Sequence, residues 1–246
     1  MNRRRVVITG LGVATPIGIG IDAFWDGLLQ KRCGIRRVEA FDPSGLPVQI
    51  AGELPAFQLG DYIPKSYRKS AKVMARDIMI AVLCAYHAVT DAKLVTKCII
   101  ERGEHPGPTN VDSTRFGANI GAGLICADLS ELAGALSTAA DEQGRFDLRR
   151  RGAEGINNLT PLWLLKYLPN MPACHISILY DLQGPNNSLT QSEAASNLAL
   201  GEAFRIIARG AADLMLTGGC DSKIHPLHMV RLGLLGIASH RNDAPE

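Results

Sequence analysis

The sequence has little of what marks a membrane protein or a nucleic-acid-binding protein. Its longest apolar stretches, such as Ile78 to Tyr86, fall well short of the ~20 residues that a bilayer span requires. With 26 Lys and Arg against 24 Asp and Glu, the formal net charge is only +2. The protein therefore lacks the strong overall positive charge that would attract a nucleic acid. We therefore expect neither a membrane nor a nucleic acid as a partner.

The sequence also lacks clustered cysteines and a signal peptide. Its six cysteines are widely spaced and include no CxxC pair, whereas disulfide frameworks and zinc sites need clustered residues. The charged-then-apolar start is interrupted by Gly10, Gly12 and Pro16, so it has no continuous apolar helix. We expect reduced thiols in a cytoplasmic protein.

What is present is enough apolar surface for a large core. Hydrophobic residues make up 46% of the 246 residues and aromatic residues 5%, which is typical of a globular protein with an aliphatic core. By length alone, residues 1–246 form one large domain or two small ones. Residues 134–158 are polar and weakly patterned, so we predict an insertion or flexible excursion there.

Strand and helix patterns alternate along the chain, which predicts a layered α/β fold. β-Branched or small-residue runs ended by glycines predict three strands, near residues 5–12, 115–123 and 213–219. Helical spacing predicts helices near 23–30, capped by Asp22, near 66–92, near 161–168, capped by Thr160, and over 193–209. In the helix over 193–209, five side chains are expected to face inward: Ala194, Ala195, Leu198, Phe204 and Ile207.

Two motifs could suggest a cofactor or a metal, and both are incomplete. The run from Gly10 to Thr15 begins like a GxGxxG dinucleotide motif, but Thr15 replaces the third glycine and Pro16 interrupts the required helix start. His225 and His228 follow Cys220, but they have no matching ligand pair elsewhere. We predict no cofactor and no metal.

A run of five cations lies in the predicted helix over residues 66–92 and just before it. The cations recur at helical spacing, so they are expected to share one face: Lys65, Arg68, Lys69, Lys72 and Arg76. A solvated helix face is one interpretation. Because only Asp77 opposes these charges, a docking surface for an acidic partner is the other.

The most informative stretch runs from Leu182 to Gly201. Its pattern predicts an apolar strand, then a polar turn, and then a helix that begins at Glu193 and is rich in small residues. A thiol at such a helix N-terminus has a lowered pKa and acts as a nucleophile, but this chain has a carboxylate there.

Together these segments resemble the β-ketoacyl-acyl carrier protein synthases, condensing enzymes of the thiolase fold. The resemblance rests on segments that occur in order along nearly the whole chain. They are Arg4 to Gly12, Thr15 to Gly18, Trp25, Gly34-Ile35, Phe41-Asp42, Leu182 to Pro185, Ala212 to Gly219 and Ala238 to Asp243. The resemblance implies a layered α-β-α, thiolase-like fold, of which this chain is the N-terminal half. The family's two catalytic histidines and its lysine follow the last segment, and the sequence stops at Glu246.

The resemblance also assigns a role to Glu193. In the family this position holds the cysteine that takes the acyl chain as a thioester. A carboxylate attacking a thioester would give a mixed anhydride that water cleaves, so we expect condensation to be impaired. Partner subunits of the family that set chain length also lack the cysteine and usually carry glutamine. A structural role for Glu193 is open as well, because a negative charge is favourable at a helix N-terminus.

Finally, the resemblance implies partners and further site residues. The basic run from Lys65 to Arg76 falls where family members dock acyl carrier protein, and Arg149, Arg150 and Arg151 are possible additions. Leu124 falls where the acyl chain length is limited, although ordinary core packing explains this strand equally well. We expect a synthase-like protein of fatty-acid or polyketide biosynthesis, as a homodimer or as a heterodimer with a synthase subunit. The alternative is a non-catalytic partner that resembles a chain-length factor.

Overall fold

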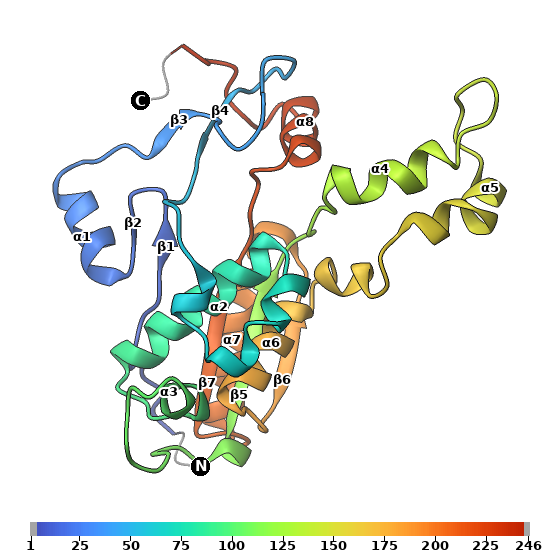
Figure 1. Cartoon of the computed structure of the whole chain (residues 1–246). Coiled ribbons are helices and arrows are strands. Elements are labelled where there is room, and N and C mark those ends of the chain that lie inside the picture. The colour runs from blue at the N-terminus through green and yellow to red at the C-terminus, as the bar shows by residue number, and fades with distance from the viewer. Residues whose placement is uncertain (1–3, 244–246) are drawn as a thin grey trace.

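A computed structural model describes residues 4–243 as an α/β fold built on a parallel sheet (Figure 1). The sheet has the strand order β6-β5-β7, in which β5 (Phe116–Ala122) pairs with β6 (Asn186–Leu189) and β7 (Leu214–Cys220). Ala118 lies opposite Asn186 on one side and Leu216 on the other. All seven residues of β5 are buried, as expected for the central strand of a parallel sheet.

Helices cover both faces of this sheet. Phe116, Ala118 and Ile120 of β5 belong to the main core, together with buried side chains of α2 (Arg76–Asp91) and α6 (Met171–Tyr180). Asn119 points to the opposite face, where its side-chain amide donates to the Ala199 carbonyl of α7 (Ala195–Ala208) at 3.2 Å. Strand alternation therefore places α2 and α6 on one face and α7 on the other, which confirms the predicted layered α/β fold.

The strands near 115–123 and 213–219 are confirmed, and the helix over 193–209 is nearly so. The predicted inward face of α7 is partly wrong. Its buried side chains are Ala195, Ala199, Ala203 and Ile206, whereas Leu198 and Phe204 are about half exposed. Small residues face the sheet because α7 packs closely against β5 and β7.

The predicted helix over 66–92 is only half right. α2 accounts for its apolar second half, but the first half consists of two 3₁₀ turns, η2 (Lys65–Tyr67) and η3 (Ser70–Val73). Met74 has extended backbone angles and breaks the chain between η3 and α2. The basic run has few apolar side chains to bury, so it gains little from a continuous helix.

The predicted first strand over 5–12 is wrong. Val7 and Ile8 are exposed, and strand pairing in this region is limited to β1 (Ala14–Thr15) with β2 (Gly18–Ile19). Gly10 and Gly12 instead lie directly on α2. A Cβ at Gly12 would sit 1.9 Å from the Cys84 carbonyl oxygen. These glycines therefore serve close packing against a helix, which explains the incomplete dinucleotide motif.

Two helix starts also differ from expectation. α1 (Ile21–Leu29) is preceded by Gly20 with φ 85°, so Asp22 lies in the first turn and does not cap it. The predicted helix over 161–168 is wrong: Leu162 has a φ of 66°, and only the short 3₁₀ turn η6 (Trp163–Lys166) follows. A left-handed residue at this point prevents a regular helix from starting at Pro161.

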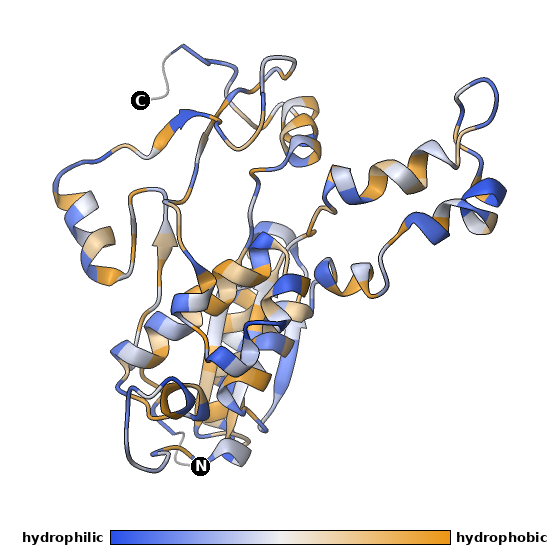
Figure 2. Ribbon diagram, viewed as in Figure 1, coloured by the Kyte–Doolittle hydropathy of each residue, from blue (hydrophilic) through white to orange (hydrophobic). Residues whose placement is uncertain are grey.

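Two smaller units lie outside the main layers in Figure 1. In the first, β3 (Ile35–Arg37) pairs with β4 (Ile50–Gly52), and Val38 and Val48 form a second core with Met229 of α8 (Pro226–Leu234). In the second, α4 (Leu129–Ser137) and α5 (Leu148–Ala153) form an arm that extends from the body. The arm contains the predicted excursion over 134–158, and α5 is largely hydrophilic (Figure 2).

The remaining described elements are short. They are α3 (Lys97–Glu101), η1 (Leu59–Asp61), η4 (Ser113–Arg115), η5 (Gly155–Asn158) and η7 (Ser192–Ala194). Within residues 4–243, no helix is both long and apolar enough to cross a membrane.

Candidate functional site

The candidate site lies at the carboxyl edge of the parallel sheet. β5, β6 and β7 end at Ala122, Leu189 and Cys220. Because the strands are parallel, the segments that follow them emerge at the same edge. Two of these segments carry residues that the sequence assigned to the site: Leu124 follows β5 and Glu193 follows β6.

Glu193 is the middle residue of the 3₁₀ turn η7, two residues before α7 begins at Ala195. Ser192, just before it, has a φ of 48°, which makes a sharp turn from strand to helix. The Glu193 side chain is exposed. The N–H groups of Ala194 and Ala195 donate to the carbonyl groups of Gln191 and Ser192, so the backbone donors next to Glu193 are already paired within this turn. The expected helix N-terminus is thus present, and it carries a carboxylate.

Two glycines bring this helix start close to the sheet. A Cβ on Gly121 of β5 would lie 2.5 Å from the Ala195 carbonyl carbon and from the Ser196 nitrogen. A Cβ on Gly219 of β7 would lie 2.5 Å from the Ser196 Cβ. The first turn of α7 therefore rests on the ends of β5 and β7, and this contact positions Glu193 at the edge of the sheet.

Leu124 presents its side chain outward from the neighbouring strand end. The side chain is 61% exposed, whereas the next residue, Ile125, is only 5% exposed. A Cβ on Gly123 would lie 2.5 Å from a carboxylate oxygen of Asp221, in the segment after β7. The ring of His228 donates from Nε2 to the Leu124 carbonyl oxygen at 2.8 Å. Leu124 is thus an exposed apolar group on a fixed backbone.

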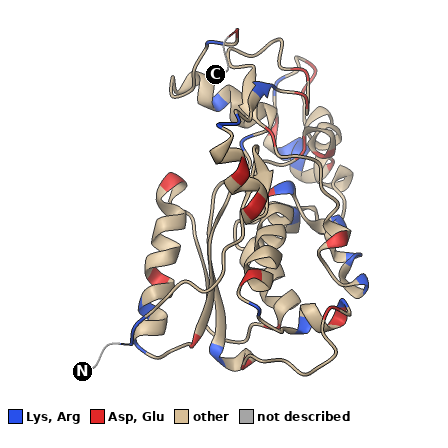
Figure 3. Ribbon diagram, turned by 90° about the vertical axis from the view of Figure 1, so that its left-hand side faces the viewer, with Lys and Arg blue, Asp and Glu red and all other residues tan. Residues whose placement is uncertain are grey.

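The five cations of the basic run are all exposed, but they do not share one helix face. They are divided between η2, η3 and the start of α2, so that prediction is wrong. Arg68 donates to the Gly60 carbonyl at 2.9 Å, and the Arg76 guanidinium lies 5.3 Å from the centre of the Phe57 ring. Elsewhere positive and negative side chains are interspersed along the chain (Figure 3). The exposed cations remain a candidate docking surface.

Asp77 does not balance these cations, because its side chain turns into the protein. It is 8% exposed and accepts a hydrogen bond from the Ser222 N–H at 2.7 Å. Burial raises the pKa of this carboxyl group, and the nearby Asp221 charge raises it further. Asp77 therefore ties the start of α2 to the segment that follows β7.

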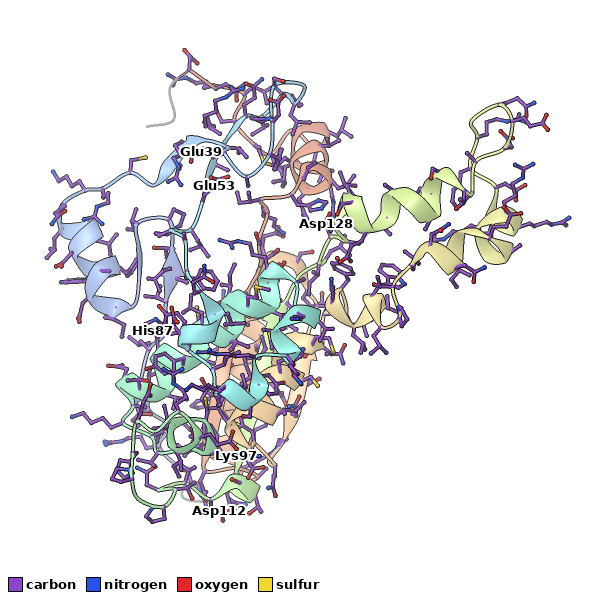
Figure 4. All side chains as sticks on the ribbon, in the orientation of Figure 1. Glu39, Glu53, His87, Lys97, Asp112 and Asp128 are labelled. Carbon is purple, nitrogen blue, oxygen red and sulfur yellow. The ribbon has the colours of Figure 1, made fainter. Side chains whose placement is uncertain are left out.

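A cavity of about 240 Å³ lies between the body and the arm. Arg76 and Asp77 line one side, and Glu131, Lys166 and Tyr167 line another. Glu131 is paired with Lys166 and accepts from the Tyr167 hydroxyl at 2.6 Å, and both contacts lower the pKa of its carboxyl group. Asp128, labelled in Figure 4, caps the start of α4 beside this cavity.

The two histidines near Cys220 have structural contacts. The Nδ1 of His225 accepts from the Leu227 N–H at 3.2 Å and caps α8, and His228 binds the Leu124 carbonyl. Over residues 4–243, no cluster of three or more His, Cys, Asp or Glu is arranged to hold a metal ion. The six cysteines all lie in this range, and each is a free thiol.

Comparison with known families decides the identity. The model of the family described as "Beta-ketoacyl synthase, N-terminal domain" matches residues 3–245. The chain belongs to the β-ketoacyl synthase family. The 3-oxoacyl-[acyl-carrier-protein] synthase 2 of Synechocystis sp. is 30% identical over 246 residues, which are 100% of this chain and 52% of that protein.

Solved β-ketoacyl synthases share the fold. A β-ketoacyl synthase from Burkholderia phymatum matches with a TM-score of 0.75 and 25% identity, over 100% of this chain and 53% of that one. The ishigamide ketosynthase/chain length factor matches with a TM-score of 0.68 and 26% identity, over 96% of this chain and 52% of that one. The chain thus spans about half the length of its relatives and has the thiolase-like fold of their N-terminal half.

The contacts of two residues of this candidate site were not predicted from the sequence. Asp77 and His228 are both buried and both bind the backbone of a segment at the sheet edge. A carboxylate at the start of the otherwise apolar run Ile78 to Val89 was a usable signal for Asp77. Nothing in the sequence around His228 indicates that it reaches Leu124, because the contact joins positions far apart in the chain.

Proposed function

We propose that this chain binds acyl carrier protein in fatty-acid or polyketide biosynthesis but does not complete the condensation typical of its family. The proposal is carried by Glu193, which lies just before α7 and which the family resemblance assigns to the position of the nucleophile. A thiolate would displace the carrier thiol from a thioester and keep the acyl group. A carboxylate would displace the same thiol but form an anhydride, which water opens to a free acid, so no acyl group would remain.

Replacing the nucleophile tests this proposal. We expect the wild-type protein, incubated with radiolabelled acyl carrier protein, to retain no label, because no stable adduct forms. Glu193→Cys is expected to retain label that hydroxylamine releases, as a thioester would. Glu193→Ala, the matched control, is expected to retain none.

Two outcomes would contradict the proposal. A stable label on the wild-type protein that Glu193→Ala removes would mean that the carboxylate itself carries the acyl group. A folded Glu193→Cys protein that never becomes labelled would mean that more than the nucleophile has been lost. Circular dichroism of each variant reports whether the fold is intact.

The carrier protein is proposed to dock on the exposed cations of η2, η3 and α2. The 30% identical Synechocystis relative has acyl carrier protein in its name, and the family resemblance implies that this partner is acidic. Lys69, which precedes η3, and Lys72, within η3, are both exposed, so they could meet an acidic surface without desolvating a buried charge.

Charge reversal tests the docking surface. We expect Lys69→Glu with Lys72→Glu to weaken binding of acyl carrier protein by roughly tenfold at low salt, and by less at high salt because exposed charges are screened. The matched control reverses Lys93 and Lys97, two exposed cations outside the basic run, of which Lys97 is the first residue of α3 (Figure 4). An equal loss in both double variants would exclude a specific docking surface.

A second candidate is a non-catalytic partner subunit that resembles a chain-length factor. It is favoured by the match to the ishigamide ketosynthase/chain length factor and by the absence of a thiol at position 193. Co-purification with an active synthase that loses activity without this chain would support it.

Either candidate is proposed to act in the cytoplasm as a dimer. β6 supports pairing, because it is a sheet-edge strand and its first two residues are exposed.

A further inference from the structure

His228 makes an unusual connection between two parts of the molecule. It lies in the first turn of α8, is 3% exposed, and donates from Nε2 to the carbonyl oxygen of Leu124 at 2.8 Å. A carbonyl can only accept, so Nε2 carries the proton. Breaking this bond would leave a polar group without its partner in an interior environment, which has a cost.

The backbone on either side of Leu124 is held as well. Gly123 approaches the Asp221 carboxylate so closely that a Cβ would clash with it, and Ile125 is buried in the main core. Between these contacts, the only polar contact found for the Leu124 backbone within the described residues is the one from His228. The hydrogen bond therefore sets the direction in which the exposed Leu124 side chain points.

His228 is itself held firmly. His225 caps the same helix, and Met229, the next residue, is buried against Val38 and Val48 in the second core. The segment that leads into α8 is tied to α2 by the hydrogen bond from Ser222 to Asp77. Because the His228 ring is held in place, its hydrogen bond fixes the position of the Leu124 backbone, and the ring does not move with that backbone.

We propose that His228 is a positioning residue that sets the longest acyl chain accepted beside Leu124. The inference rests on the proposed function and on the expectation, implied by the family resemblance, that Leu124 lies where the length of the acyl chain is limited. With the hydrogen bond intact, the leucine side chain stays in place and blocks longer chains. Without the hydrogen bond, the segment from Gly123 to Leu124 can shift by a small distance. The leucine side chain then moves aside and leaves room for additional methylene groups of the acyl chain.

The test measures dissociation constants for acyl carrier proteins loaded with saturated chains, from hexanoyl to hexadecanoyl, on the full chain by calorimetry. For His228→Leu we expect unchanged binding of short chains. Chains beyond the wild-type limit should bind about fourfold more tightly for each additional methylene that is buried. His228→Asn, whose shorter amide cannot reach the carbonyl, is expected to show the same shift if His228→Leu does not fold.

Two further variants separate positioning from packing. His228→Gln, which keeps an N–H donor on a longer side chain, is expected to restore the wild-type length limit. Met229→Ala weakens the same helix without touching the hydrogen bond, so it should lower stability and leave the length limit unchanged. A length limit that moves with Met229→Ala but not with His228→Leu would overturn the inference.

Leu124→Ala distinguishes failure of the inference from failure of the proposed function. If Leu124→Ala extends the accepted chain length and His228→Leu does not, His228 has no positioning role and the proposed acyl site still stands. The other outcome is that the wild type and all variants bind every loaded carrier protein as tightly as the unloaded one. In that case the proposed acyl site itself is wrong.

Discussion

Replacing Gly121 by alanine is expected to lower the free energy of unfolding by about 3 kcal/mol, the upper part of the usual range for overpacking. The added Cβ would lie 2.5 Å from two backbone atoms of α7, the Ala195 carbonyl carbon and the Ser196 nitrogen. Backbone cannot change rotamer, so the whole first turn of α7 must move away from β5. Urea unfolding followed by circular dichroism measures the loss, and the move would also displace Glu193.

Gly201 provides the matched control for this substitution. It lies in the same helix, and a Cβ there would meet nothing within 4 Å. Gly201→Ala is therefore expected to raise stability by about 1 kcal/mol, because alanine favours the helical conformation. If Gly121→Ala is as stable as the wild type, the close contact between β5 and α7 does not hold in solution.

The second large effect is expected at Asp77. Asp77→Ala removes the acceptor of the Ser222 N–H, whereas Asp77→Asn keeps an oxygen in the same place. We expect the alanine variant to be about 2 kcal/mol less stable than the asparagine variant, which is the cost of leaving the partly buried Ser222 N–H unpaired. Denaturant unfolding of the two variants at one pH gives this difference directly.

The pH dependence of Asp77 gives an independent check. Its folded-state pKa is raised above 3.8 by burial, so the folded protein favours the protonated carboxyl. That contribution to stability is present at pH values below 3.8 and is lost as the pH rises through the folded-state pKa. Asp77→Asn is never charged, so its stability relative to the wild type should be greatest at neutral pH and should shrink in acid. A difference that grows in acid would contradict this assignment.

Much of the central sheet could be predicted from the sequence, for a physical reason. β5 and β7 are short runs of apolar and small residues ended by glycines, and such runs are stable only when neighbours cover both faces. α7 was predicted for a similar reason. Its buried face was not, because Leu198 and Phe204 look like core residues, while three of the four side chains that α7 buries are alanines.

The failures share a different cause. The run over 5–12 has the composition of a strand, but a strand also needs a partner, and glycine contacts with α2 hold this segment instead. The basic run before α2 has helical spacing, but spacing alone does not supply a buried face. In both places the local pattern was clear and the tertiary contact decided the outcome.

The residues of the candidate site also differ in whether they depend on a local pattern or on a distant contact. The place of Glu193 at a helix start could be predicted from the sequence, because a strand followed by a helix is a local feature, whereas its assignment to the nucleophile position comes from the family resemblance. Asp77 and His228 act through single hydrogen bonds to the backbone of distant segments. Neither the composition nor the periodicity of a sequence indicates such a contact, so it is seen only in the folded structure.

The order of strands in the sheet has a consequence for how the chain folds. β5 is central, yet both of its partners come much later in the sequence, since Ala118 pairs with Asn186 and with Leu216. The contact order of this sheet is therefore high, and the entropy of closing two long loops must be overcome before β5 gains any pairing. During synthesis on the ribosome, β5 emerges long before β7, with two unpaired edges. We expect folding to be slow and to depend on α2 and α6 shielding that strand until β7 arrives.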